Sequence, residues 1–279
     1  MTERQHIIYN YLRTTKKFPS LWCPGCGIGI FLGAFLRAID KSGYTKDQIV
    51  LISGIGCSGR ITTYVDFNTL HTTHGRALTF ATGIKLVKPE LKVIVIMGDG
   101  DAVAIGGNHF IHAARRNIEI TAIVINNGVY GMTGGQLSPT TPLEMKTATS
   151  PFGNLENPFD ICQLAEGAGS VFVARATTYH VGLMEKVISK ALKKKGFSVV
   201  EIISQCPVQY GRRVGLNSAV EMMEWQRDHT ITEERARGLS EEELQGKIRI
   251  GVLVDREAPT YQERLEKLRE SLKEKAGAL

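Results

Sequence analysis

The sequence predicts an α/β protein with a mainly parallel, twisted sheet and helices on both of its faces. Apolar runs of strand length alternate with amphipathic segments of helix length, which is typical of repeated βαβ units. The chain is also long enough to bury a sizeable core, because it has 279 residues of which 43% are hydrophobic.

The predicted elements follow one another through the first two hundred residues. Apolar runs predict strands at 49–53, 93–97, 121–126, 171–175 and 198–203. Amphipathic stretches predict helices near 29–41, 75–87, 106–115, 158–168 and 179–194. Ligands of such sheets bind outside the carboxyl ends of the strands. We therefore look for the site in the segments that directly follow predicted strands, which are 54–59, 98–100 and 126–127.

The composition shifts towards charge after Pro207, which predicts two parts in the chain. Ser240 followed by Glu243 is typical of a capping box, and 260–275 predicts an amphipathic helix with its leucines on one face, namely Leu265, Leu268 and Leu272. We expect residues 1–206 to carry the cofactor and metal sites. Residues 207–279 are expected to form a helical extension packed on the core or on a partner.

Charge and hydrophobicity exclude some classes of partner. The longest apolar runs, such as 120–125, are too short to cross a bilayer, and the N-terminus lacks the apolar stretch of a signal peptide. A cytoplasmic location without membrane contact is therefore expected. The net charge of +6 favours anionic partners. No aromatic residues interleave with the basic ones, so nucleic acid is not expected.

Two strand ends carry oxygen ligands beside glycines. One reads Gly98-Asp99-Gly100-Asp101, and the other is the segment 126–131, Asn-Asn-Gly-Val-Tyr-Gly. Mg²⁺ prefers oxygen ligands and commonly sits between protein groups and the phosphates of a ligand. The alternative is a pair of ordinary turns, in which Asp99 caps a helix. The spacing resembles the thiamine-diphosphate motif, and this resemblance implies that Mg²⁺ is held by Asp99, Asn127 and the carbonyl of Val129.

The five cysteines predict a metal site better than disulfides. An odd number in a chain without a secretion signal argues against a disulfide framework. Cys23 and Cys26 form a C-x-x-C pair, and Cys57 and Cys206 each follow a predicted strand. Four thiolates suit either Zn²⁺ or a [4Fe–4S] cluster, and the two distant single ligands favour the cluster over a zinc knuckle or a redox dithiol. Cys162 lies in a helical stretch and is expected to be a buried core thiol.

A dinucleotide fingerprint is a competing interpretation of the segment 54–59. Gly54, Gly56 and Gly59 satisfy the G-x-G-x-x-G pattern after a strand. A Rossmann unit should carry an acidic residue about twenty positions later. The sequence has His71-Thr-Thr-His74 there instead, so the match is weak.

Several motifs together resemble one enzyme family over roughly residues 8 to 215. They are Trp-Cys-Pro-Gly-Cys-Gly at 22–27, Gly-Ile-Gly-Cys-Ser-Gly-Arg at 54–60, His-Thr-Thr-His-Gly-Arg-Ala at 71–77, Gly-Asp-Gly-Asp at 98–101, Asn-Asn-Gly-Val-Tyr-Gly-Met at 126–132 and Gln-Cys-Pro at 205–207. The chain resembles the β subunit of 2-oxoacid:ferredoxin oxidoreductases, most closely the 2-oxoglutarate type. The resemblance implies a PP-type thiamine-diphosphate-binding fold.

The resemblance also implies roles for individual residues. The [4Fe–4S] ligands would be Cys23, Cys26, Cys57 and Cys206. Thiamine diphosphate would be contacted by Ile55, Gly56, Cys57, Ser58, His74, Gly75, Arg76, Ala77, Gly100, Asp101, Gly131 and Met132. Catalytic roles would fall to His74 and to Arg60, which is placed to face the substrate carboxylate. Gly134 stands where relatives have Lys, which bears on substrate range.

The expected reaction is the reversible, CoA-dependent oxidative decarboxylation of 2-oxoglutarate to succinyl-CoA and CO₂, with electrons passed to ferredoxin. The sequence offers no motif for the glutamate that activates thiamine. The resemblance assigns it to an α subunit with the pyrimidine-binding domain, so this chain is expected to be active only with that partner. The alternatives are a pyruvate or branched-chain 2-oxoacid enzyme, a non-redox thiamine-dependent decarboxylase, or a zinc-bearing binding or regulatory module.

Overall fold

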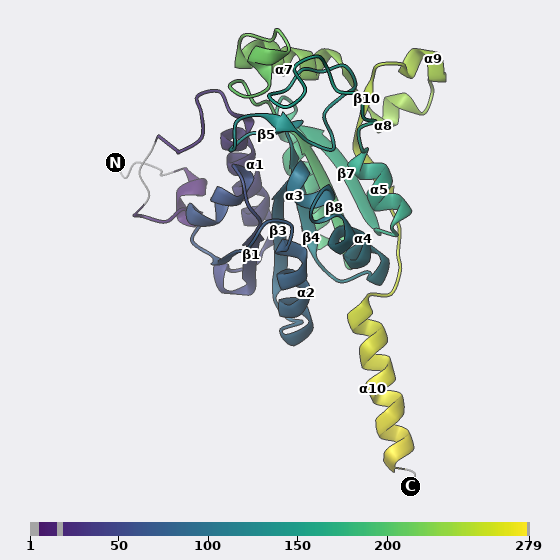
Figure 1. Cartoon of the computed structure of the whole chain (residues 1–279). Coiled ribbons are helices and arrows are strands. Elements are labelled where there is room, and N and C mark those ends of the chain that lie inside the picture. The colour runs from purple at the N-terminus through teal and green to yellow at the C-terminus, as the bar shows by residue number, and fades with distance from the viewer. Residues whose placement is uncertain (1–5, 16–18, 278–279) are drawn as a thin grey trace.

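A computed structural model describes residues 6–15 and 19–277 and centres on one eight-stranded sheet (Figure 1). Its order is β2-β1-β3-β4-β8-β7-β10-β9. The strands are β1 (Ile49–Ser53), β2 (Asn68–His71), β3 (Lys92–Gly98), β4 (Thr121–Asn126), β7 (Phe172–Thr177), β8 (Ser198–Ile203), β9 (Thr230–Thr232) and β10 (Ile248–Asp255). A separate short hairpin pairs β5 (Val129–Tyr130) with β6 (Gln136–Leu137). The predicted α/β class with a mainly parallel sheet is confirmed.

The pairing of β10 with β7 is antiparallel, whereas the other six pairs of neighbouring strands in the sheet are parallel. All five predicted strands are present, with ends shifted by a few residues at most. Three further strands, β2, β9 and β10, were not predicted. β2 is half-exposed and polar at the sheet edge, while β9 and β10 lie in the charged segment after Pro207. Residues beyond 206 therefore contribute two strands to the sheet, and the proposed division at that point stays a prediction.

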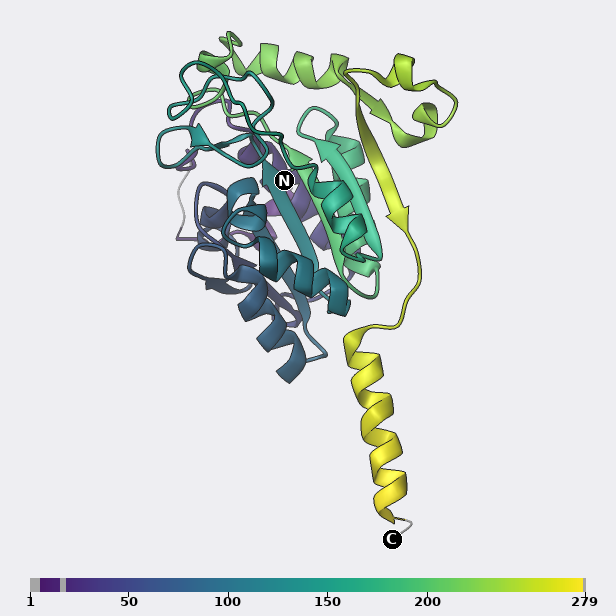
Figure 2. The ribbon, with the colours of Figure 1, turned by 45° about the vertical axis from the view of Figure 1, so that its right-hand side comes forward.

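Helices cover both faces of the sheet (Figure 2). One face packs against α1 (Gly27–Ser42) and α6 (Val181–Lys193), and the other against α2 (Ala77–Val87), α4 (Gly107–Arg116) and α5 (Ile161–Gly167). Successive strand residues alternate between the two cores, as strand geometry requires: Ile94 and Ile96 enter the first, whereas Val93 and Val95 enter the second. Because both of their faces are buried, the central strands β1, β3 and β4 are mostly apolar.

The shorter elements lie mostly in the connections. They are the 3₁₀ turns η1 (Ile7–Tyr11), η2 (Lys46–Gln48), η3 (Ser58–Thr63) and η4 (Gly211–Arg213), with the helices α3 (Asp99–Val103), α7 (Ala219–Asp228), α8 (Glu233–Ala236) and α9 (Glu241–Leu244). The capping box predicted at Ser240 is present at the start of α9, where Glu243 accepts from the Ser240 N–H. Within the described residues, no helix combines the length and apolarity needed to cross a membrane.

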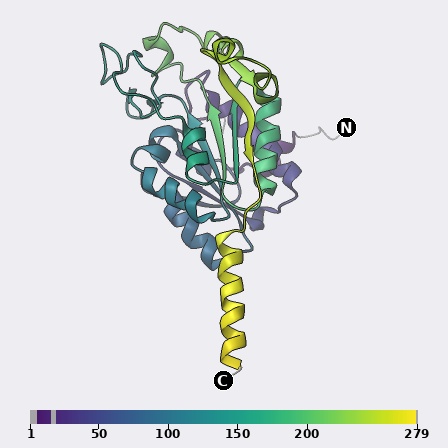
Figure 3. The ribbon, with the colours of Figure 1, turned by 90° about the vertical axis from the view of Figure 1, so that its right-hand side faces the viewer.

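The last helix, α10 (Tyr261–Gly277), projects away from the body of the protein (Figures 1 and 3). Its first turn is anchored, because the Asn117 side chain donates to the carbonyls of Ala258 and Pro259, and the Tyr261 N–H donates to the Asn117 carbonyl. Beyond that turn, the side chains of Leu268 and Leu272 are each 55% exposed. The predicted amphipathic helix thus exists, and its apolar stripe faces outward in this chain.

A buried lysine in the core should make stability depend on pH. Lys92 begins β3 and is 4% exposed. Burial lowers its pKa to about 8, with Glu119 opposing the change and Lys85 adding to it. In the unfolded chain Lys92 has its ordinary pKa of 10.5. Below about pH 8 the folded protein must therefore bury a charged ammonium, which lowers the free energy of unfolding. This loss of stability disappears as the pH rises from about 8 to 10.5, because the folded form then carries a neutral Lys92.

Lys92→Met is therefore expected to raise the free energy of unfolding at pH 7 by up to about 3 kcal/mol, since each pKa unit corresponds to about 1.4 kcal/mol. The gain should shrink as the pH approaches 10.5. Urea unfolding of the two proteins at pH 7 and pH 9.5 measures both effects. A gain that is absent at pH 7, or equal at both pH values, would contradict the burial of a charged ammonium.

Candidate active site

The site lies at the carboxyl ends of the central strands, at the point where the strand order reverses. From β1 the chain first adds β2 on one side and then β3 on the other, so the loops after β1 and β3 diverge there. This reversal is the usual ligand position in open α/β sheets. The loop after β1, the turn into α3 after β3 and the loop after β4 all contribute to one cavity there.

The cavity gathers most of the predicted cofactor residues. Those that line it are Ile55, Gly56, Cys57, Ser58, His74, Asp99, Gly100, Asp101, Asn127, Val129, Gly131 and Met132. Five further lining residues were not predicted to contact a cofactor, namely Ile28, Gly98, Ile125, Tyr130 and Thr133. Ile28 belongs to α1 and Ile125 to β4. Side chains from distant segments therefore meet in one concave surface.

Asp99 is the most constrained carboxylate of the cavity. It is 3% exposed at the first position of α3, where the positive end of a helix favours an anion. Its Oδ2 accepts hydrogen bonds from Ser138 Oγ at 2.5 Å and from Thr140 Oγ1 at 2.7 Å. Burial raises the pKa of Asp99, and the two hydroxyl donors oppose that rise. Ser138 and Thr140 sit in a loop without periodicity, so no sequence signal identified them.

The loop after β4 is held by its own two asparagines. The Gly128 N–H donates to Asn126 Oδ1 at 3.1 Å, and the Val129 N–H donates to Asn127 Oδ1 at 3.3 Å. Gly128 has a φ of 71°, a left-handed conformation that glycine adopts without a Cβ penalty. Asn127 and Val129 consequently reach the same cavity as Asp99.

Asp101 fixes the histidine of the cavity. Its Oδ1 accepts from the Gly75 N–H at 2.6 Å and lies 2.6 Å from His74 Nδ1. A carboxylate only accepts, so Nδ1 carries the proton and Nε2 carries the lone pair in neutral His74. Burial raises the pKa of Asp101, and the Gly75 and His74 donors oppose the rise. Its buried Oδ2 faces the loop after β1, and the backbone N–H of Ile55 in that loop also opposes the rise in the pKa.

Glycines let the backbone come close to these groups. A Cβ built on Gly54 would lie 1.7 Å from Asp101 Oδ2, and one on Gly100 would lie 2.3 Å from a carbon of the Tyr130 ring. Neither distance is physically possible for a side chain, so both positions require glycine. The loop after β1 can therefore lie directly on Asp101.

The four cysteines of the predicted quartet converge beside the cavity. Cys23 and Cys26 are joined by a tight turn in which the Cys26 N–H donates to the Cys23 carbonyl at 3.0 Å, and Cys26 then caps α1. The Cys57 carbonyl accepts from Trp22 Nε1 at 2.8 Å. A Cβ on Gly131 would be 3.7 Å from Cys206 Sγ and 3.8 Å from Cys57 Sγ.

The pKa shifts of Cys26, Cys57 and Cys206 show that the cysteines of the quartet lie close enough to affect one another's charge. Burial raises the pKa of Cys26 to about 12 and also raises the pKa of Cys57 and of Cys206. Negative charge on the other cysteines raises the pKa of all three further, with Cys23 acting on each of them. Four thiolates at this place therefore need a cationic centre to be stable together.

The spread of the quartet distinguishes between metals. Over residues 6–15 and 19–277, the one set of three or more His, Cys or acidic ligand atoms that all lie within 4.8 Å of one another is Asp160, Cys162 and Glu201. No three sulfur atoms of the quartet are that close. Tetrahedral zinc, with Zn–S bonds of about 2.3 Å, holds its sulfurs about 3.8 Å apart. The quartet is wider than such a site and leaves room for a larger centre.

Several predicted site residues do not line the cavity. Gly75 contributes its N–H to Asp101, Arg76 is exposed with Nη1 2.6 Å from His109 Nε2, and Ala77 is buried at the start of α2. Arg60 lies on η3. Its positive charge opposes the rise in the pKa of Cys57 and adds to the effect of burial in lowering the pKa of His71. The guanidinium is thus near the quartet. Its predicted contact with substrate stays a prediction.

The comparison with protein families agrees with this geometry. Residues 54–202, more than half of the chain, match the family model of the thiamine pyrophosphate enzyme, C-terminal TPP binding domain. The matched range begins with the loop after β1 and ends in β8, so it contains β3, β4 and every residue that lines the cavity except Ile28. The fold and the site thus define a thiamine-pyrophosphate-binding domain.

Similar proteins narrow the family further. The 2-oxoglutarate synthase subunit KorB of Archaeoglobus fulgidus is 64% identical over 198 residues, covering 71% of this chain and 73% of that protein. KorB of Methanocaldococcus jannaschii is 47% identical over 96% of this chain and 99% of its own. A solved 2-oxoglutarate:ferredoxin oxidoreductase from Magnetococcus marinus, with 2-oxoglutarate, coenzyme A and succinyl-CoA bound, has a TM-score of 0.85 at 34% identity, covering 97% of this chain and 92% of that one. The chain belongs to the KorB family of 2-oxoglutarate:ferredoxin oxidoreductase β subunits, and the predicted family is confirmed.

Proposed function

We propose that this chain is the cofactor-bearing β subunit of an enzyme that converts 2-oxoglutarate and CoA to succinyl-CoA and CO₂, reversibly, with ferredoxin as the electron acceptor. The observation that carries the proposal is the convergence of the Asp99–Asn127–Val129 oxygen set and the cysteine quartet on one cavity. The substrates named for the Magnetococcus marinus relative support the choice of 2-oxoacid. Pyruvate or a branched-chain 2-oxoacid is the alternative.

Thiamine diphosphate and Mg²⁺ fit the residues present. A carboxylate, an amide oxygen and a carbonyl form the half-shell of oxygens that Mg²⁺ accepts beside a diphosphate. Asp99, Asn127 and Val129 would supply them. Glycines at 56, 100 and 131 leave the adjoining cavity wall free of side chains, so a diphosphate can approach the backbone. When bound, thiamine diphosphate supplies a nucleophilic carbon and an electron sink for decarboxylation of a 2-oxoacid.

A [4Fe–4S] cluster fits the cysteine quartet. The four sulfurs converge from three separate segments, and their separation is wider than a zinc site requires. Cys57 belongs both to the quartet and to the cavity wall, so a cluster there would adjoin the cofactor. Such a cluster accepts electrons one at a time and passes them to a carrier protein.

Side chains of this subunit would bind substrate and move protons. Asp101 holds His74 with its Nε2 lone pair free to accept a proton, and His74 lines the cavity. Arg60 is proposed to bind the substrate carboxylate, because a guanidinium pairs with carboxylates through two hydrogen bonds. The thiamine contacts assigned to Gly75, Arg76 and Ala77 stay proposals.

Two further chains complete the proposed enzyme. An α subunit would bring the pyrimidine-binding domain and the activating glutamate, which this sequence lacks as a motif. Ferredoxins are acidic carriers, and the net charge of +6 favours their approach. A cytoplasmic location, expected from the sequence, stays a prediction.

The test is anaerobic co-purification of this chain with its α subunit. Iron, sulfide, zinc and thiamine diphosphate are quantified, and CoA-dependent reduction of ferredoxin is then measured with 2-oxoglutarate, pyruvate and branched-chain 2-oxoacids. We expect about four irons per αβ unit, bound thiamine diphosphate and the highest kcat/KM for 2-oxoglutarate.

Each alternative has its own signature in the same experiment. A colourless complex without iron that still decarboxylates would indicate a non-redox thiamine enzyme. Zinc without thiamine diphosphate would indicate a binding or regulatory module. A preference for pyruvate would leave the site intact and change only the substrate.

A further inference from the structure

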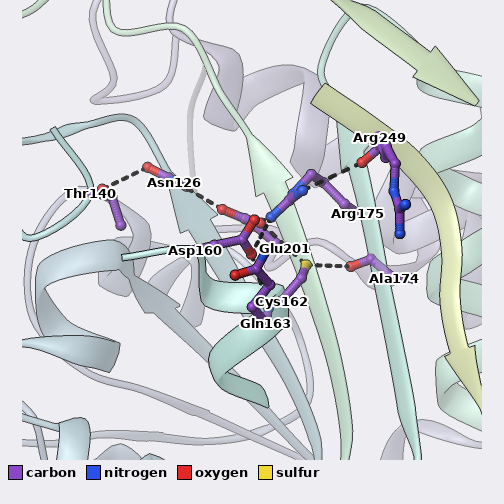
Figure 4. Close-up of polar contacts among 9 residues, drawn as sticks. All are labelled: Asn126, Thr140, Asp160, Cys162, Gln163, Ala174, Arg175, Glu201 and Arg249. Carbon is purple, nitrogen blue, oxygen red and sulfur yellow. Dashed lines mark hydrogen bonds and ion pairs between the residues drawn. The ribbon is translucent and has the colours of Figure 1, made fainter. Parts of the chain in front are cut away.

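A hydrogen-bond network links the buried strands β7 and β8 to Asn126 and Thr140 (Figure 4). At its centre is Glu201 of β8, which is 3% exposed. Its Oε2 accepts from Arg175 Nε at 2.6 Å, and its Oε1 accepts from Asn126 Nδ2 at 2.7 Å. The two oxygens thus link a buried cation on β7 to the first asparagine after β4.

The acidic groups around Arg175 do not form a cation site. Asp160, Cys162 and Glu201 bring three ligand atoms within 4.8 Å of one another. However, the Arg175 guanidinium already binds both carboxylates, because its Nη2 lies 2.6 Å from Asp160 Oδ1. Cys162 donates to Glu201 Oε2 at 3.3 Å. The positive charge is supplied from within the protein, so the cluster needs no added metal.

Glu201 determines which way the Asn126 amide points. A carboxylate paired with a guanidinium only accepts, so the amide must turn its Nδ2 towards Glu201. Asn126 Oδ1 then faces the other way, where it accepts from the Gly128 N–H at 3.1 Å and lies 3.0 Å from Thr140 Oγ1. In the flipped amide, oxygen would face oxygen at Glu201 and N–H would face N–H at Gly128. Glu201 therefore selects one orientation.

The orientation of the Asn126 amide affects the oxygens proposed for Mg²⁺ through two sets of contacts. Thr140 Oγ1 lies 2.7 Å from Asp99 Oδ2 and 3.0 Å from Asn126 Oδ1, so these two acceptors share its single hydroxyl proton. The Gly128 N–H, fixed by Asn126, sits in the turn between Asn127 and Val129. Both the carboxylate and the loop that carries the other two ligands depend on Asn126.

We propose that Glu201 is a positioning residue for the metal site, which acts by fixing Asn126 and through it Asp99 and the turn that carries Asn127 and Val129. This inference rests on the proposed function, because it takes Mg²⁺ and thiamine diphosphate as the ligands of the cavity. Residues that orient metal ligands from outside the coordination sphere typically change metal affinity 10- to 100-fold when they are replaced.

Glu201→Gln tests the proposal in the intact αβ complex. A glutamine amide can donate as well as accept, so Asn126 is no longer restricted to one orientation. We expect the Mg²⁺ concentration that half-saturates binding of thiamine diphosphate to rise about 10- to 100-fold. Saturating Mg²⁺ should restore cofactor occupancy to the wild-type level, and iron content should be unchanged. Rescue by Mg²⁺ would not be seen if the substitution merely disrupted the fold.

Two further variants make the outcome decisive. Glu185→Gln is the matched control, because Glu185 also accepts from an arginine, Arg37 Nε at 2.7 Å, but lies on α6, away from the network. Binding of thiamine diphosphate to the Glu185→Gln complex should depend on Mg²⁺ as it does in wild type. Thr140→Val removes the hydroxyl between Asn126 and Asp99 but keeps the shape of the side chain and the ion pair between Arg175 and Glu201. This variant tests the network if the Glu201→Gln complex fails to assemble. We expect Thr140→Val also to raise the Mg²⁺ concentration that half-saturates binding of thiamine diphosphate.

A failure of the positioning role of Glu201 can be distinguished from a failure of the proposed function. Wild-type Mg²⁺ dependence in both Glu201→Gln and Thr140→Val would overturn the positioning role alone. A wild-type complex that does not bind thiamine diphosphate with Mg²⁺ would overturn the proposed function itself.

Discussion

Asp99→Ala is expected to abolish Mg²⁺-dependent retention of thiamine diphosphate by the αβ complex while leaving its iron content near that of wild type. Asp99 is the buried carboxylate of the proposed Mg²⁺ set, and Ser138 and Thr140 hold its Oδ2 in place. Removing a ligand should exceed the 10- to 100-fold effect of removing an orienting residue, so we expect a loss of more than about 100-fold in metal affinity. Unlike Glu201→Gln, this variant should not be rescued by practical Mg²⁺ concentrations.

The measurement is cofactor content after gel filtration at several Mg²⁺ concentrations, with iron determined on the same samples. Asp47→Ala is the control, because Asp47 is an exposed aspartate in η2, which precedes β1 and so lies at the other end of that strand from the cavity. Equal cofactor occupancy in Asp99→Ala and wild type would remove Asp99 from the ligand set. Loss of iron together with the cofactor would instead indicate a general disruption of the subunit.

Cys206→Ser should remove most of the iron and acid-labile sulfide, together with the visible absorption of the cluster. The Cys206 sulfur lies against Gly131 beside Cys57, and a serine hydroxyl is a much poorer ligand for iron than a thiolate. Thiamine diphosphate should still bind with Mg²⁺, because Cys206 is not among the residues that line the cavity. Ferredoxin reduction should fall to background.

The matched control for this variant is Cys162→Ser. Cys162 is also buried, but it hydrogen-bonds Glu201 and lies outside the quartet. Its replacement should leave iron and sulfide at wild-type values. If Cys206→Ser kept a wild-type iron stoichiometry and spectrum, Cys206 would not be a ligand.

The central strands and the loops after them could be predicted from the sequence. β1, β3 and β4 are buried on both faces, so each is a mostly apolar run with glycine or asparagine at its end or directly after it. Because the carboxyl ends of parallel strands meet at one edge, residues such as Asp99 and Asn127 could be placed together without knowing the full strand order. Local pattern and global topology agree at this edge of the sheet.

The parts that could not be predicted lack such a pattern. β2 is a half-exposed edge strand with polar residues, and β10 pairs antiparallel with β7 from a charged part of the chain. Arg175 and Glu201 are charged residues within buried strands, and only the pairing of β7 with β8, which sets them opposite each other, makes their burial possible. Ser138 and Thr140 reach Asp99 through a loop whose path no local sequence rule specifies.

The projecting helix α10 has a consequence for self-association. Half-buried Leu265 and exposed Leu268 and Leu272 are spaced at intervals of three and four, as in one seam of a coiled coil, and Arg264 and Arg269 flank that seam. Two copies that met along it in parallel would set Arg264 of one helix against Arg269 of the other. Like charges at those positions repel, so the exposed leucines do not by themselves drive this helix to dimerise with its own kind.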